Sequence, residues 1–441
     1  MKRALIVLLP AFLLLPALAF AADKPATTTA PTFTKDVAPI FYDRCVTCHR
    51  DGNVAPMSLI TYNEVRPWIK SIREKVTART MPPWTADPTY GHFLNDRTLT
   101  TAQIETIKTW VDTGAKEGDA KDLPVAPKFA RGWNVGEPDQ VFEMEEEFTV
   151  PAEGVVVYQH FAVPTNFKED KWIRAAEIRN VDSSVVHHVI VFIQPPPTDR
   201  PKPFGIIPGK NFDTGKRDAP AEIKGTKVNR ETLGYFLTAT GPGERGTVFP
   251  AGSGMRIPAG SNLIFQIHYT PKGKSVKDHA KIGLFYLSQP PVNEIRTIGV
   301  QNGRFTIPAG EANHRVDSSV TFAEDARIWG LIPHMHLRGK SFEYRLITPD
   351  GQSRVVLSIP KYDFNWQMIY SLAEPLVIPK GSRLECTAYY DNSKGNKYNP
   401  DATKDVKWGD QTWEEMMIGF MTYSLDSQQI KKSAVTEGSS R

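Results

Sequence analysis

The sequence predicts a multidomain protein in which a small all-α domain precedes two tandem all-β sandwich (jelly-roll) domains. Its 441 residues exceed what one hydrophobic core usually serves, so two or three domains are expected. Apolar residues recur at helical spacing near the amino terminus, whereas short alternating runs separated by turns fill most of the remainder. The 35 prolines and 31 glycines favour turn-rich β structure over a helical bundle.

Residues 1–21 have the pattern of a secretory signal peptide. Lys2 and Arg3 precede a long apolar run, and Ala19, Phe20 and Ala21 form a cleavage site at its end. An uncleaved anchor is the alternative, because the run is nearly long enough to span a bilayer. Cleavage predicts a periplasmic or secreted protein without a membrane span.

The charge balance argues against nucleic acid as a partner. The formal net charge is +4, and it falls to +2 when Lys2 and Arg3 leave with the signal peptide. The sequence contains no block of lysine and arginine. Its 40% apolar and 23% charged residues are ordinary values for a globular protein.

Cys45, Cys48 and His49 have the spacing used for covalent attachment of haem c. Two thiols can form thioethers with the haem vinyl groups while the next imidazole binds the iron. A thioredoxin-like motif or half of a zinc site is the alternative. The first normally follows a strand, and the second needs another thiol pair. The third cysteine, Cys386, lies in a strand-like run and is expected to be a buried free thiol.

Helices are expected on both sides of this motif. The stretch "FTKDVAPIFYDRC" is amphipathic at helical spacing. A second helix is expected to begin at Thr100, where Gln103 completes a capping box, and to end at Gly114. This arrangement is typical of small cytochromes c, which residues 33–118 resemble.

The resemblance implies a methionine as the sixth iron ligand. Met81 is preferred, because Pro82 and Pro83 would stiffen the loop that presents it. Met57 is the alternative. A histidine–methionine pair leaves no open iron position, so this haem is expected to carry electrons from an external donor and not to bind oxygen.

A linker at 119–134 separates this domain from a long β region. Two sandwiches are expected, at 135–290 and 291–425, dividing near "QPPVNE". The stretch from Gln194 to Arg217 has no strand pattern and is predicted to be a surface loop. Residues 426–441 are polar and predicted to be a disordered tail.

Five histidines fall in strand-like runs of this β region. His334 and His336 are separated by one residue, so on one strand their side chains would lie on the same face and could bind one ion. His187 and His188 are neighbours, so they can share a metal if the strand bulges or ends there, or if they use different ring nitrogens. His268 lies in "FQIHYTP".

Each of these histidine groups also has a structural explanation, since strand histidines often satisfy their hydrogen bonds within a core. Met416, which precedes another expected strand, adds a thioether to His334 and His336. Two imidazoles with a thioether form a soft site that favours copper over zinc. Core packing is the alternative role for Met416. His160 is expected to be a satisfied strand residue, with support of a metal ligand as its alternative.

The order H-H, Q-x-H-Y, H-x-H and E-E-M resembles the type II copper, ascorbate-dependent monooxygenases, which include the peptide-amidating and dopamine-hydroxylating enzymes. The resemblance covers roughly Trp133 to Tyr423. It implies two tandem β-sandwich domains, each with one copper, that face each other across a solvent-filled cleft. Gln266 matches a glutamine that the family keeps near this cleft.

The resemblance also implies a role for each metal ligand. The electron-storing copper would be held by His187, His188 and His268. The copper at which oxygen binds and a C–H bond is hydroxylated would be held by the catalytic residues His334, His336 and Met416.

Departures from the family concern the disulfides and the substrate pocket. Animal members have several disulfides across this core, whereas Cys386 is the one cysteine here. The amidating branch has an arginine two residues before H-x-H, where this chain has Ile332. The family's tyrosine four residues after the methionine ligand is Phe420 here. The expected substrate is therefore a small organic molecule and not a peptide carboxyl terminus.

The domain order predicts an oxidoreductase in which the attached haem supplies electrons to the storage copper. A non-enzymatic exported haem–copper protein, carrying electrons or binding copper, is the alternative. A zinc hydrolase would need a carboxylate base, and none lies close to His334 or His336 in the sequence.

Overall fold

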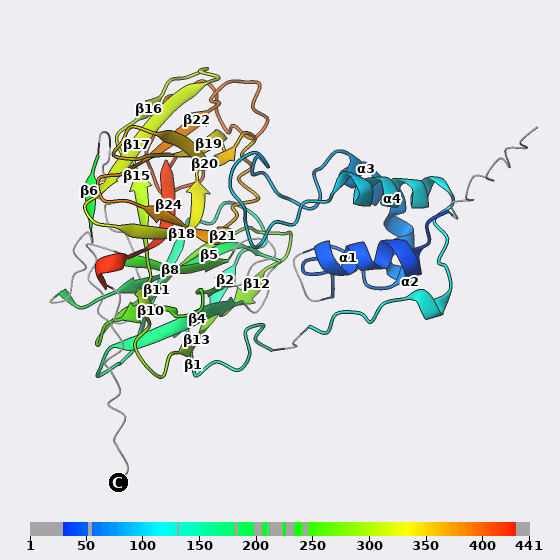
Figure 1. Ribbon diagram of the computed structural model, residues 1–441, viewed down its shortest axis with the longest axis horizontal. Helices are drawn as coiled ribbons and strands as arrows, with labels where there is room; N and C mark the ends of the chain where they lie inside the picture. Colours follow the sequence, from blue (N-terminus) through cyan, green and yellow to red (C-terminus); the bar gives the residue numbers. More distant parts are fainter. Residues whose placement is uncertain are drawn as a thin grey trace, which may run out of the picture.

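The structure is a computed structural model that describes residues 30–51, 55–129, 132–180, 184–197, 205–209, 211, 224–225, 233–240 and 246–428. The predicted signal peptide at 1–21 lies outside these residues. The described chain is mostly β with few helices, and the helices lie to one side of the sheets (Figure 1). Within the described ranges, no helix is both long enough and apolar enough to cross a membrane.

The helical segment confirms the helices expected around the cysteine motif. Its elements are η1 (Phe33–Val37), α1 (Ala38–Arg44), α2 (Tyr62–Val65), η2 (Arg66–Trp68), α3 (Ile69–Thr77), α4 (Thr101–Asp112) and η3 (Ala120–Asp122). The Thr100 hydroxyl accepts from Gln103 N at 3.2 Å, and Gln103 Oε1 accepts from Thr100 N at 2.9 Å. Gly114 follows with φ of +98°, as a C-terminal cap requires.

A first β unit, residues 140–294, contains two large sheets around one apolar core and a two-stranded sheet formed by β2 and β12. One sheet has the order β1-β13-β4-β10-β14 with β9 also on β4, and the other has the order β7-β3-β11-β5-β8. The strands are β1 (Gln140–Glu143), β2 (Phe148–Val150), β3 (Gln159–Pro164), β4 (Lys171–Arg179), β5 (Val186–Gln194), β7 (Lys224–Gly225), β8 (Tyr235–Thr240), β9 (Gly246–Val248), β10 (Ser253–Ile257), β11 (Asn262–Tyr269), β12 (Val276–Asp278), β13 (Lys281–Tyr286) and β14 (Asn293–Glu294).

A second β unit, residues 296–425, repeats this plan around a separate core. Its sheets have the orders β15-β24-β18-β21 and β20-β19-β22-β17-β6. The strands are β15 (Arg296–Gln301), β16 (Thr306–Ile307), β17 (His314–Phe322), β18 (Ala326–His334), β19 (Gly339–Ile347), β20 (Ser353–Ile359), β21 (Tyr370–Ile378), β22 (Arg383–Tyr390), β23 (Val406–Lys407) and β24 (Ile418–Leu425). The chain passes between the units at Ile295, because β14 pairs with β10 and β15 pairs with β24.

Two expectations about irregular segments need correction. The stretch 194–217 was expected to lack strands, yet β6 (Ile206–Pro208) pairs with β17 of the second unit. An exposed strand edge offers backbone partners to any extended segment, so three residues can pair without an alternating pattern. The tail was expected to be disordered from 426, but Asp426–Gln428 form the 3-10 helix η5; residues 429–441 lie outside the description.

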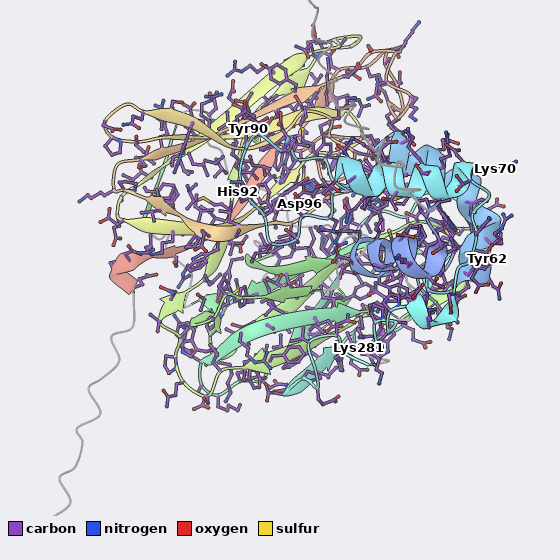
Figure 2. All side chains as sticks on the ribbon, turned by 45° about the vertical axis from the view of Figure 1, so that its right-hand side comes forward. Tyr62, Lys70, Tyr90, His92, Asp96 and Lys281 are labelled. Atoms are coloured by element: carbon purple, nitrogen blue, oxygen red, sulfur yellow. The ribbon has the colours of Figure 1, made fainter. Side chains whose placement is uncertain are left out.

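The loop after α3 fastens the helical segment to the second β unit. His92 O accepts from Ala373 N at 2.8 Å, and the loop carrying His92 runs against this unit in Figure 2. The hydroxyls of Thr85 and Tyr370 lie 2.9 Å apart. The rings of Trp84 and Phe93 pack edge-on against Tyr370 at 5.0 and 5.5 Å. The loop between α3 and α4 is thus held against strand β21 by hydrogen bonds and side-chain packing.

Candidate metal centre

A β-bulge brings His187 and His188 to the same side of the first β unit. Strands β5 and β11 pair so that His268 lies opposite His188, and Tyr269 lies opposite Val186. His187 is therefore the extra residue of the bulge. An extra residue breaks the strict alternation of a strand, so both side chains can turn toward His268. The bulge that a shared metal site requires is present.

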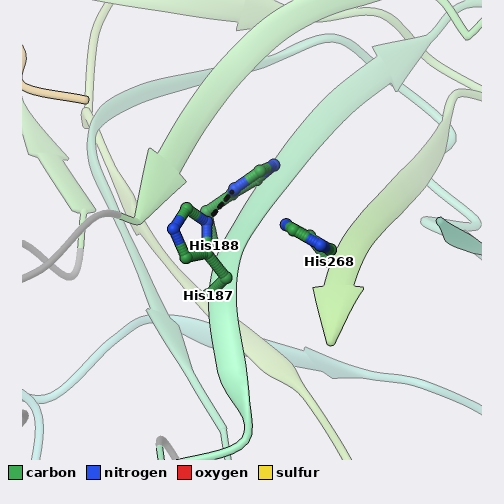
Figure 3. Close-up of side chains that lie close together, drawn as sticks. All are labelled: His187, His188 and His268. Atoms are coloured by element: carbon green, nitrogen blue, oxygen red, sulfur yellow. Dashed lines mark hydrogen bonds between the residues drawn. The ribbon is translucent and has the colours of Figure 1, made fainter. Parts of the chain in front are cut away.

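The three imidazoles converge (Figure 3). Nδ1 of His187 lies 3.0 Å from Nδ1 of His188, and one candidate ligand nitrogen from each of the three rings lies within 4.8 Å of the others. His268 Nδ1 is buried and has no hydrogen-bond partner among the described residues. The Tyr158 ring packs beside His188 and His268 at 5.7 and 5.0 Å. This donor set fits a single ion.

Burial keeps these three imidazoles neutral. Desolvation lowers the pKa of His187 to about 4 and that of His268 to about 3. Desolvation lowers the pKa of His188 well below its ordinary value, and the neighbouring histidines lower it further. A neutral imidazole has a lone pair to offer, so the environment suits metal binding near pH 7.

His334 and His336 meet at the end of strand β18. The strand ends at His334, so the expectation that one strand carries both histidines needs correction. The Tyr362 hydroxyl accepts from Met335 N at 3.0 Å and donates to Met335 O at 2.8 Å, which holds the backbone between them. The two buried rings lie 5.3 Å apart at 89°.

Hydrogen bonds indicate which nitrogen of each ring carries the proton. His334 Nδ1 donates to Gln367 Oε1 at 2.6 Å, and His336 Nδ1 donates to the Glu414 carbonyl at 3.2 Å. A neutral imidazole that donates through Nδ1 presents its lone pair at Nε2. His336 Nε2 is buried without a hydrogen-bond partner in the described part of the chain. Both rings are thus prepared to bind an ion through Nε2.

Met416 is brought to the same neighbourhood by Glu415. The buried Glu415 carboxylate accepts from the backbone N–H of His336 at 2.8 Å and of Arg338 at 2.6 Å. Met416 is buried in an apolar cluster with Ile332 and Phe420, two residues before β24 begins. Among the contacts described, none joins the Met416 sulfur to an imidazole.

Glu415 is a buried acid that the sequence analysis did not identify as part of the site. Burial raises its pKa to about 8, although the two N–H donors act in the opposite direction. Both carboxylate oxygens are occupied by backbone N–H groups. Glu415 therefore holds Met416 and His336 together and is poorly placed to serve as the base of a zinc hydrolase.

The two histidine groups face one pocket. His187, His188 and His334 line it, and its volume is about 40 Å³, which admits roughly three water molecules. Phe364 lies between the groups, since its ring stacks on His187 at 4.8 Å and lies 6.1 Å from His336.

The loop 361–369 supplies residues that no motif indicated. Phe364 stacks on His187, and Gln367 is hydrogen-bonded to His334. Ile369 lines the pocket. Gln266, which was expected near the cleft, donates through its side-chain amide to His160 Nε2 at 2.9 Å. His160 therefore supports the strand that carries His268, two residues beyond Gln266.

The segment Cys45–His49 lies where helix α1 ends. Cys45 caps α1, and the backbone N–H groups of Cys48 and His49 both donate to the Cys45 carbonyl. Both cysteines are free thiols, and burial raises the pKa of Cys45 to about 12. Met57 packs against the helical core together with Cys45, whereas Met81 lies half-buried after α3. The expected burial of the free thiol Cys386 is confirmed.

One comparison concerns the unit that carries the H-x-H pair. Residues 295–438 match the family model of the copper type II ascorbate-dependent monooxygenase, C-terminal domain. The match begins at the crossing point between the two β units and includes His334, His336 and Met416. The resemblance inferred from the histidine pattern is thus confirmed for this segment.

Other comparisons are weak. No curated protein matches the chain. Among solved structures, one titled PNGF-II in a C2 space group has 11% identity and a TM-score of 0.28, with 65% of this chain and 64% of that chain covered. The chain thus spans less than two thirds of that protein's length. The major capsid protein P2 from bacteriophage PM2 has 11% identity and a TM-score of 0.26, with 65% and 97% covered. Scores this low carry no argument.

Proposed function

We propose that this protein is a copper-dependent monooxygenase that hydroxylates a C–H bond of a small organic molecule. The observation that carries the proposal is the convergence of His187, His188 and His268, two of which line the same pocket as His334. The match of residues 295–438 to a copper monooxygenase domain supports it. The overall reaction takes R–H, O₂, two electrons and two protons to R–OH and water.

Two copper ions are proposed, one in each β unit. His187, His188 and His268 would hold one ion, and His334, His336 and Met416 would hold the other. Bound copper would supply electron storage at the first group and oxygen activation at the second. The neutral imidazoles and the unpartnered, buried His268 Nδ1 and His336 Nε2 support this assignment.

The domain assignment belongs to the same proposal. Residues 135–290 and 291–425 would be tandem β-sandwich domains, which the two separate cores and paired sheets support. Residues 33–118 would be a c-type cytochrome joined through the linker 119–134. We further propose export to the periplasm or beyond, supported by the leader pattern in residues 1–21.

Haem would be attached through Cys45 and Cys48, with His49 as one iron ligand and Met81, or alternatively Met57, as the other. Its chemistry would be electron supply from an external donor. The packing of Trp84 and Phe93 on Tyr370 supports joint action, because it holds the helical segment against the unit that carries His334.

Metal analysis of the mature protein tests the proposal. We expect two copper ions and one haem per chain, together with oxygen uptake that depends on an organic substrate and a reductant such as ascorbate. Zinc in place of copper, or copper without substrate-dependent oxygen uptake, would contradict the proposed activity.

Replacing Met416 with isoleucine is expected to abolish turnover. The variant loses the thioether but keeps the three-histidine group, so about half of the bound copper should remain. Copper content and oxygen uptake measure these effects. Met417→Ile is the matched control, because Met417 packs into the core of the second β unit instead of the apolar cluster at the pocket. Equal turnover of the two variants would exclude Met416 as a ligand.

Replacing Gln367 with leucine is expected to lower the copper affinity of the His334–His336 site by about 10- to 100-fold. Leucine removes the acceptor that keeps the proton of His334 on Nδ1. Copper titration followed by electron paramagnetic resonance separates this ion from the one at the three histidines. Gln367→Glu should restore affinity, since a carboxylate also accepts from Nδ1. An equal loss of copper affinity at both sites would instead indicate that the substitution destabilises the whole protein.

A further inference from the structure

The pocket between the histidine groups has walls that are mainly apolar. Both β units contribute to them; the apolar members are Ile190, Phe236, Ala239, Ile332, Ile369 and Phe420. The rings of Phe236 and Phe420 meet across the two units at 5.4 Å. Such walls complement apolar ligand surface, because contact with them removes that surface from water.

Apart from the histidines, the polar side chains of the wall have partners within the protein. Gln367 accepts from His334 Nδ1, and its amide donates to the Phe364 carbonyl at 3.2 Å. Thr240 Oγ1 accepts from Val189 N at 3.0 Å. The Asn365 side-chain amide donates to Asp363 at 3.0 Å. A polar substrate would therefore find few hydrogen-bonding groups waiting for it.

The wall also lacks charge. None of the described residues that line the pocket is an aspartate, glutamate, lysine or arginine. Ile332 lies two residues before His334 on β18 and contributes an apolar side chain next to the imidazole. In the copper-free chain, a charged ligand would lose its hydration here without gaining a counter-ion.

We propose that the substrate is a small uncharged molecule that presents an apolar C–H group to this pocket. The volume of about 40 Å³ accommodates a short alkyl group. The inference rests on the proposed function, since it takes this pocket as the place of hydroxylation. It concerns the walls of the pocket, however, and can be tested without copper.

The test is a binding titration of the full mature chain before copper is added. The isoleucine δ1-methyl groups are labelled with ¹³C, so Ile190, Ile332 and Ile369 report from inside the pocket. Propane, propionate and propylammonium serve as probes of similar length. We expect propane to shift these three methyl signals. The two ions should bind at least about a hundredfold more weakly.

A substitution in the wall should reverse this preference. Ile332→Arg is expected to weaken propane binding and to strengthen propionate binding by about tenfold or more. Val377→Arg places the same charge on an exposed position of β21 and should leave all three titrations unchanged. If Ile332→Arg does not fold, Ile332→Ala is used instead; it enlarges the pocket and should keep the preference for propane.

Two outcomes would overturn the substrate class. One is a shift of the three methyl signals by propionate or propylammonium at concentrations equal to or below those of propane. The other is the absence of a shift with every probe. A failure of the proposed function has a different signature: the chain would bind no copper or consume no oxygen, while the propane titration would remain as expected.

Discussion

Replacing His188 with alanine is expected to remove one of the two copper ions and to abolish turnover. His188 lies opposite His268 in the β5–β11 pair, and its Nδ1 lies 3.0 Å from that of His187. Loss of one of three ligands should lower the affinity for that copper ion by more than about 100-fold. Substitution of a residue that only supports a ligand already lowers metal affinity about 10- to 100-fold. Copper content per chain and the electron paramagnetic resonance spectrum measure the loss.

Stability gives a second readout for the same variant. At free copper about 100 times the dissociation constant, a bound ion stabilises the native protein by about 2.7 kcal/mol, and the variant should lose that increment. His314→Ala is the control, because His314 is the first residue of strand β17 in the second unit and is not among the residues that line the pocket. If His188→Ala bound two copper ions with unchanged affinity, the three-histidine assignment would be wrong.

Replacing Cys45 and Cys48 together with alanine is expected to eliminate covalent haem and to leave both copper ions in place. The thioethers need both sulfurs, whereas the copper ligands belong to the two β units. Haem absorbance of the denatured chain should disappear, and copper content should stay at two per chain. Oxygen uptake driven by ascorbate should persist, because a small reductant can reach copper without the haem.

This double substitution is a cleaner experiment than deletion of residues 23–125. Deletion would also remove Trp84 and Phe93, which pack on Tyr370 and join the core of the second unit. Cys386→Ala serves as the control for thiol loss, since that buried cysteine lies on β22 away from the haem motif. Loss of copper in the double variant would show that the helical segment has a structural role at the metal sites.

The regular elements could be predicted because their signals are local. Alternation of apolar residues indicated β4, β11, β19 and β22, and the capping box at Thr100 indicated the start of α4. The strand β6 was missed because its three residues are extended only through pairing with β17. The end of β18 at His334 was also missed, since the Tyr362 hydroxyl that holds Met335 is distant in the sequence.

The residues of the candidate site likewise divide into those that a sequence pattern indicated and those that only the folded structure brought to the site. His334, His336 and Met416 indicated a soft metal site, and the family resemblance extended the set to six possible copper ligands. Phe364 and Gln367 carry no such signal, and Glu415 belongs to the E-E-M motif but was given no role from the sequence. Their roles arise from contacts with His187, His334 and His336 that folding creates between separate loops and strands.

The amino-acid sequence by itself determined the donor atoms available to this protein: two thiols and an imidazole with the spacing of a haem-attachment motif, and five imidazoles and a thioether proposed here as copper ligands. Tertiary structure decided how those groups meet. The bulge at His187, the neutral state of the buried imidazoles and the uncharged wall around Ile332 depend on which strands pair and which side chains exclude water. Donor atoms are properties of residues, whereas separation, protonation and access are properties of the packed chain.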